Sequence, residues 1–145
     1  MAGVKLRQYE TKRDCKHIRR RVSFSKVERL GAEPMLYDVA RARGIAASRA
    51  LARDAAGAER VSLGELMRYL TASGYAPYAD AGSVRLRNCP FDSVAQEFAS
   101  VTCGMNLALV QGILERADLN AVYEARLDPR PGECCVSLAS KTTLS

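Results

Sequence analysis

Aromatic residues are scarce in this sequence of 145 residues, which contains no tryptophan and only 6% aromatic residues in total. Hydrophobic residues nevertheless make up 48% of the chain, and the length is that of one domain. A core must therefore be built mainly from Leu, Val, Ala and Met. The alanine content favours helices in close contact.

Long hydrophobic runs are also missing. No stretch of 18 apolar residues occurs, so the sequence predicts no membrane span. Residues 1–7 combine basic residues with no following apolar run, which is not typical of a secretory signal. The sequence therefore predicts a cytoplasmic protein with no membrane partner.

Histidine occurs once, as His17, in a basic N-terminal segment. A cysteine or serine nucleophile needs a base within hydrogen-bond reach, and His is the commonest. No pair of carboxylates stands in a setting that would raise a pKa. We therefore expect no enzymatic activity.

Positive charge is concentrated at one end of the chain. Residues 1–29 carry a net charge of +7, although the whole chain carries only +6. We predict a basic arm or linker over residues 1–33, an effector domain over 34–139 and a flexible tail over 140–145. The arm could neutralise nucleic-acid phosphates, with a solvated arm as the alternative. The candidate phosphate contacts are Lys12, Arg13, Lys16, Arg19, Arg20 and Arg21.

Periodicity and turn residues predict an α+β fold. Helices are expected over 34–56, 63–73, a short stretch from Asp92, and 104–116. Strands are expected over 75–79, 83–88, 120–127 and 134–139. Ser62 and Glu65 form a capping-box pattern for the second helix. The expected architecture is an antiparallel sheet of two hairpins, about four strands, with helices packed on one face.

The five cysteines do not suit a disulfide framework, because the count is odd and two are adjacent. Cys89 is expected at a strand end, Cys103 just before a helix and Cys134 at a strand start. Three such thiolates can converge at one end of a layered domain, where soft sulfur ligands select zinc, copper(I) or an iron–sulfur cluster. Two alternatives stay open: cysteines that only pack, and thiols that sense redox state.

Three motifs carry a family resemblance. They are Asn88-Cys89-Pro90-Phe91, Cys103-Gly104-Met105-Asn106 and Cys134-Cys135-Val136. Together they resemble the C-terminal half of the ArsR-like winged-helix regulators, a family that includes the repressor of the iron–sulfur cluster assembly operon. The resemblance covers roughly residues 35–139 and is sharp from about residue 62.

This resemblance implies the effector and dimerisation domain of a transcriptional regulator, acting as a homodimer. It further implies that Cys89, Cys103 and Cys134 hold an iron–sulfur cluster or zinc. The family's winged helix should precede residue 35, where this sequence has only the basic arm. DNA binding is therefore expected only with an upstream winged helix or through the arm. The alternative functions are non-specific nucleic-acid binding by that arm, and small-molecule binding with purely structural cysteines.

Overall fold

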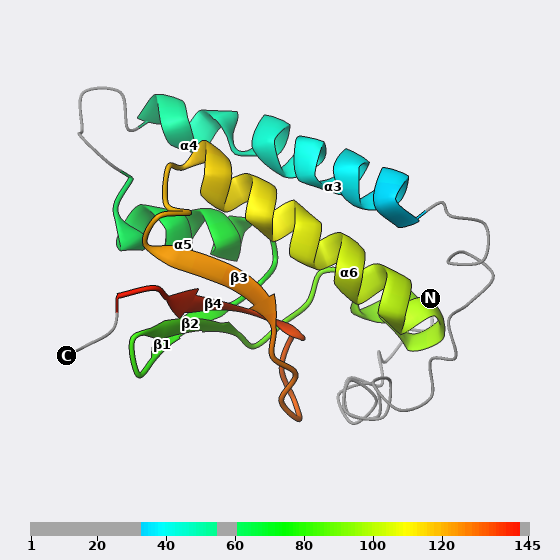
Figure 1. Cartoon of the computed structure of the whole chain (residues 1–145). Coiled ribbons are helices and arrows are strands. Elements are labelled where there is room, and N and C mark those ends of the chain that lie inside the picture. The colour runs from blue at the N-terminus through cyan, green and yellow to red at the C-terminus, as the bar shows by residue number, and fades with distance from the viewer. Residues whose placement is uncertain (1–32, 55–60, 143–145) are drawn as a thin grey trace, which may run out of the picture.

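A four-stranded antiparallel sheet forms the base of the fold in the computed structural model, which describes residues 33–54 and 61–142 (Figure 1). Its strands are β1 (Pro77–Asp80), β2 (Ser83–Leu86), β3 (Tyr123–Leu127) and β4 (Val136–Ser140). The order β1-β2-β4-β3 places the two hairpins side by side. The predicted α+β fold is confirmed. The basic arm with its six candidate phosphate contacts, and His17, lie outside the described residues.

The β1–β2 hairpin follows the turn chemistry of its sequence. Asp80 pairs with Ser83, so Ala81 and Gly82 form a two-residue turn. Both have positive φ, +47° and +79°, as the type I′ turn that suits strand twist requires. Pro77 lies in the edge strand, where its missing N–H costs no ladder bond.

The helices lie on one face of this sheet (Figure 1). They are α3 (Glu33–Ala47), α4 (Arg49–Asp54), α5 (Leu63–Ala72) and α6 (Asp92–Arg116). The start of α5 confirms the predicted capping box. The Ser62 hydroxyl accepts a bond from the Glu65 backbone N–H at 3.2 Å, and the Glu65 carboxylate accepts one from the Ser62 N–H at 2.7 Å.

Two predicted helix boundaries are wrong. The helix predicted over 34–56 is divided at Ser48, whose buried hydroxyl donates to the Gly44 carbonyl at 2.7 Å. Such bonding to the preceding turn often bends a helix. The two helices predicted after Asp92 are joined in α6 across a kink at Phe98 (φ −128°, ψ 48°), so the division was predicted but its position, near Gly104, was wrong. Cys103 therefore lies inside a helix and not before one.

The main core lies between α6 and the sheet, and α3 packs on α6 (Figure 1). The α3–α6 contact uses glycine, as its sequence position suggested. A Cβ atom on Gly44 would lie 2.1 Å from the Leu109 carbonyl oxygen, and one on Gly112 would lie 2.2 Å from the Arg41 carbonyl oxygen. The two helix backbones are thus in direct contact. The fully buried core residues include Leu66, Leu70, Val84, Leu86, Val110, Val136 and Leu138.

Among the described helices, α6 is the one that is long and apolar enough to cross a membrane by length and composition alone. This is a weak indication, since core helices pass the same test. Here α6 packs against both α3 and the sheet. Its polar residues Thr102 and Asn106 are buried inside the protein. In the described part of the chain, α6 is therefore a core helix.

Candidate thiol site

Two of the three predicted ligand cysteines meet where the central strands begin and end. Cys89 follows β2 by three residues, and Cys134 precedes β4 by two. The Cys134 backbone N–H donates to the Leu86 carbonyl at 2.8 Å, so the two chain segments run side by side there. The Cys89 and Cys134 side chains lie on either side of one amide nitrogen, Asn106 Nδ2, which is within hydrogen-bond distance of both sulfur atoms. Cys134 is 4% exposed and Cys89 is half-buried.

A buried amide from α6 faces both sulfur atoms. Asn106 is 1% exposed, and its Nδ2 donates to Cys134 Sγ at 3.4 Å and to Cys89 Sγ at 3.8 Å. Its Oδ1 accepts a 2.6 Å bond from the hydroxyl of Tyr75, which is also 1% exposed. Because the hydroxyl donor takes the amide oxygen, the NH₂ group must face the thiols. A thiol is a weak acceptor and a thiolate a strong one, so this amide favours negative charge on the sulfurs.

The pKa values of the two thiols are shifted in opposite directions. The hydrogen bond from Cys134 lowers the pKa of Cys89, although burial opposes the effect. The pKa of Cys134 is raised, first because its proton is held in that bond and second because the group is buried. Burial, together with the nearby Cys134 and Cys89 sulfurs, raises the pKa of the Tyr75 hydroxyl. Cys89 is therefore the nucleophilic member of the pair.

Cys103 lies one helical turn before Asn106 and is half-buried. We predicted that a helix N-terminus would stabilise its thiolate, and this is wrong because the residue lies in the interior of α6. Burial and the Cys89 sulfur raise the pKa of Cys103 to about 11. Its sulfur is thus near the pair without hydrogen bonding to it.

The cysteine pair fits two ligands of a soft metal. Its sulfurs adjoin, and Asn106 supplies the N–H donor that commonly supports a metal-bound thiolate. Within residues 33–54 and 61–142, however, no group of three or more His, Cys, Asp or Glu residues is arranged to hold a metal ion. The structure therefore brings together Cys89 and Cys134 and leaves Cys103 beside them.

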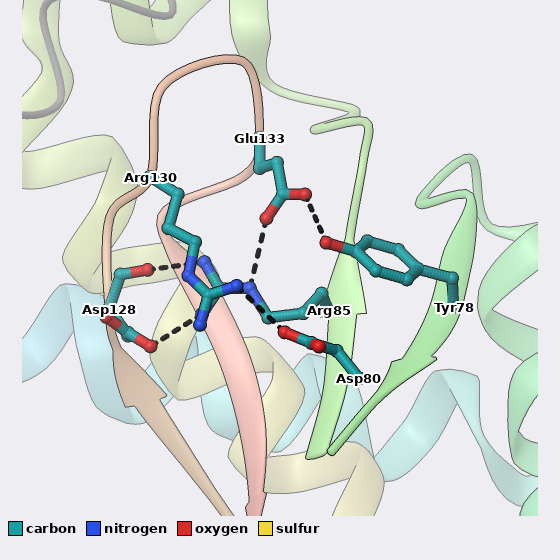
Figure 2. Close-up of polar contacts among 6 residues, drawn as sticks. All are labelled: Tyr78, Asp80, Arg85, Asp128, Arg130 and Glu133. Atoms are coloured by element: carbon teal, nitrogen blue, oxygen red, sulfur yellow. Dashed lines mark hydrogen bonds and ion pairs between the residues drawn. The ribbon is translucent and has the colours of Figure 1, made fainter. Parts of the chain in front are cut away.

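An ion-pair cluster holds the loop that leads to Cys134. The Arg85 side chain lies in this cluster and is only 2% exposed. Figure 2 shows its guanidinium between Asp128 and Glu133, at 2.5 Å and 3.0 Å. The Tyr78 hydroxyl donates to the second carboxylate oxygen of Glu133 (Figure 2). Since Glu133 directly precedes Cys134, this cluster helps to fix the thiol pair.

An apolar groove of about 590 Å³ lies between α3 and α6. Met105 faces this groove, on the other side of α6 from Asn106. Arg43 is the charged residue among the groove's lining. The other lining residues are Leu36, Val39, Ala40, Ala46, Ala47, Phe91 and Leu109.

Sequence reasoning did not identify Tyr75 or Asn106 as site residues. One signal was present: buried residues recur along α6 at every fourth position, Thr102, Asn106 and Val110, so Asn106 stands on the core-facing stripe. Comparison with known protein families, with curated proteins and with solved structures finds no match for the chain. The resemblance to ArsR-like regulators therefore stays a prediction.

The pKa directions predict which thiol reacts first with an alkylating reagent. In metal-free protein, Cys89 should be alkylated fastest between pH 7 and 9, because its lowered pKa gives more thiolate than an ordinary thiol. Its rate should level off at a lower pH than that of a peptide thiol. The Cys103 rate should keep rising towards about pH 11. A timed iodoacetamide pulse with peptide mapping measures both, and a Cys103 rate equal to that of Cys89 at pH 7 would contradict the assignment.

Proposed function

We propose that this chain contains the effector domain of an ArsR-like transcriptional regulator and senses a thiolate-bound centre, an iron–sulfur cluster or zinc. Cys89 and Cys134 supply the ligand pair and Cys103 the third thiolate. The observation that carries the proposal is the adjacent Cys89–Cys134 pair with the buried Asn106 amide directed at both sulfurs. Whether such a centre is bound, and in which oxidation state, would depend on the metal supply and on the redox conditions of the cell.

The local chemistry supports a ligand site better than simple packing. A core cysteine that only fills space needs no polar partner. Here a fully buried asparagine is placed against two thiols, and its only other described bond is to a buried tyrosine. Burying the polar groups of Tyr75, Asn106 and Cys134 together lowers the stability of the fold unless the hydrogen bonds among them are strong. Thiolate sulfur provides stronger bonds than thiol sulfur does.

The contact between α6 and α3 could carry a structural change from the thiol site to other parts of the regulator. The residues Cys103 and Asn106 belong to α6, which packs backbone to backbone on α3 through Gly44 and Gly112. A shift of α6 on ligand binding is therefore transmitted to α3. As in the family, we propose a cytoplasmic homodimer whose DNA affinity requires a winged-helix domain or the basic arm. Two states with different ligand affinities are the physical requirement.

The decisive measurement is the metal and sulfide content, with a visible spectrum, of protein purified without oxygen. We expect iron and sulfide, or zinc, at stoichiometric levels, with loss of the centre in each of Cys89→Ser, Cys103→Ser and Cys134→Ser. Met105→Leu is the matched control, since its sulfur is two residues from Cys103 but faces the groove. This swap of similar volume should cost less than about 1.5 kcal/mol and retain the metal.

A colourless, metal-free protein whose variants remain folded would overturn the proposal. Circular dichroism of each variant establishes folding. That outcome would leave the cysteines as packing or redox residues. The groove between α3 and α6 would then be the site to examine for an organic effector.

A further inference from the structure

The Cys89–Cys134 pair has the arrangement of a dithiol that can close. Two thiols that contact the same amide nitrogen need little movement to reach bonding distance, whereas residues on rigid, separated elements cannot be bridged. Both sulfurs lie within 3.8 Å of the same Asn106 nitrogen. The backbone bond from Cys134 N–H to the Leu86 carbonyl already ties the two segments together. Both residues lie outside the regular strands, so closing the pair need not disturb the paired residues of β2 and β4.

We propose that Cys89 and Cys134 form a reversible intramolecular disulfide when the protein meets a peroxide, and that this disulfide excludes the thiolate-bound centre. Formation of the disulfide does not depend on the proposed function, whereas the exclusion of the thiolate-bound centre rests on it. A sulfur atom in a disulfide has lost the thiolate charge that binds soft metals. Oxidation and occupancy of the site are therefore mutually exclusive states.

The chemistry balances with hydrogen peroxide as the named oxidant. The Cys89 thiolate attacks one peroxide oxygen, the O–O bond breaks, hydroxide leaves, and Cys89 becomes a sulfenic acid. The Cys134 sulfur then attacks the sulfenic sulfur, the S–O bond breaks, and the hydroxide leaves as water with the Cys134 proton. Two electrons pass from the two thiols to one peroxide molecule. A thiol reductant reverses the cross-link by thiol–disulfide exchange.

Burial assigns the order of these steps. Cys89 is half-buried and follows the strand end, so it is the sulfur that peroxide can reach. Cys134 is 4% exposed and shares the Asn106 nitrogen with Cys89, so it suits the resolving role. Asn106 does not link Cys103 to either sulfur among the described hydrogen bonds. Cys135 is already disulfide-bonded, contrary to the expectation that the cysteines form no disulfide, so Cys89, Cys103 and Cys134 are the free cysteines among the described residues. Disulfide formation on oxidation should therefore select one pair among these three thiols.

The test treats the metal-free full-length chain with hydrogen peroxide, blocks remaining thiols with iodoacetamide and maps the peptides by mass spectrometry. We expect the Cys89 and Cys134 peptides to be cross-linked, with a loss of about 2 Da relative to the two thiol peptides. The cross-link should disappear after treatment with dithiothreitol. In Cys134→Ser, Cys89 should instead accumulate as a sulfenic acid that dimedone traps.

Other outcomes would overturn the inference. Cross-linking of Cys103 in preference to this pair would do so, as would a Cys89 sulfenic acid in the unaltered chain with no cross-link. Because the first measurement uses no metal, it is independent of the proposed function. Preincubation with zinc tests the second part: zinc should slow the cross-link if the same sulfurs bind it. An unchanged rate in protein shown to hold zinc would refute mutual exclusion.

Discussion

Replacing Arg85 by methionine should lower the free energy of unfolding by about 3–5 kcal/mol, the usual cost of removing one partner from a buried ion pair. The Arg85 side chain is 2% exposed, and Glu133 opposite it is 17% exposed. Methionine fills much of the volume but leaves the Glu133 carboxylate without its cation. Asp128, at 42% exposed, is better able to turn towards water. Urea denaturation measures the change, and the melting temperature should fall by roughly 10–20 °C.

The neighbouring ion pair supplies a matched control. Arg130 contacts Asp80 at 2.8 Å in the same region (Figure 2), but the side chains are 50% and 36% exposed. Arg130→Met should therefore cost less than about 1 kcal/mol. A second variant tests the cause: Arg85→Met combined with Glu133→Gln should recover part of the loss, because no unpaired carboxylate is left at position 133. Equal effects of Arg85→Met and Arg130→Met would contradict the role given to burial.

The burial of Arg85 shows where sequence patterning fails. Along β2, strand alternation places Val84 and Leu86 on one face and Arg85 on the other, yet all three side chains are buried. Alternation says which face a residue occupies and nothing about what covers that face. The partners Asp128 and Glu133 come from a loop more than 40 residues away in sequence. Pattern reasoning cannot pair groups at that separation.

Local signals were reliable wherever a short-range hydrogen bond or a turn decides the structure. The capping box at Ser62 and the turn at Ala81-Gly82 formed as predicted, since each depends on residues within four positions. Helix continuity was predicted poorly. Gly104 was taken as a start, yet α6 runs through it because the Tyr37 ring packs where a side chain would lie. Packing against α3 overrides the intrinsic weakness of glycine in a helix.

The thiol site was predictable in its cysteines and not in its polar partners. Cys89, Cys103 and Cys134 were all expected to converge, and of these Cys89 and Cys134 share the Asn106 amide while Cys103 lies beside them. Asn106 could not be assigned because a polar residue within an apolar helix can be exposed or buried, and Tyr75 could not be assigned because its partner Asn106 is 31 residues away in sequence. Only the fold shows that Asn106 lies between Tyr75 and the two sulfurs. This placement is what turns a set of cysteines into a candidate sensor.

Replacing either contact glycine between α3 and α6 by alanine should destabilise the protein by about 1–3 kcal/mol, near the upper end. The new Cβ would lie 2.1 Å (Gly44) or 2.2 Å (Gly112) from a backbone carbonyl oxygen of the facing helix. Backbone cannot move aside as a side-chain tip can, so the helices must separate. Gly64→Ala is the control: its Cβ would make only ordinary contacts, the nearest 3.9 Å from the Ser62 hydroxyl oxygen, and the substitution should stabilise α5 by about 0.5–1 kcal/mol.

The double variant distinguishes helix separation from two independent local clashes. Gly44 and Gly112 face the same contact, since the Cβ of Gly44 would also lie 3.2 Å from the Gly112 Cα. Once one alanine has forced the helices apart, the second meets open space. The Gly44→Ala/Gly112→Ala protein should therefore lose clearly less stability in urea than the two single losses combined. Full additivity would mean that each clash is relieved locally, and a displacement of α6 at the thiol site would then not be passed to α3 through this contact.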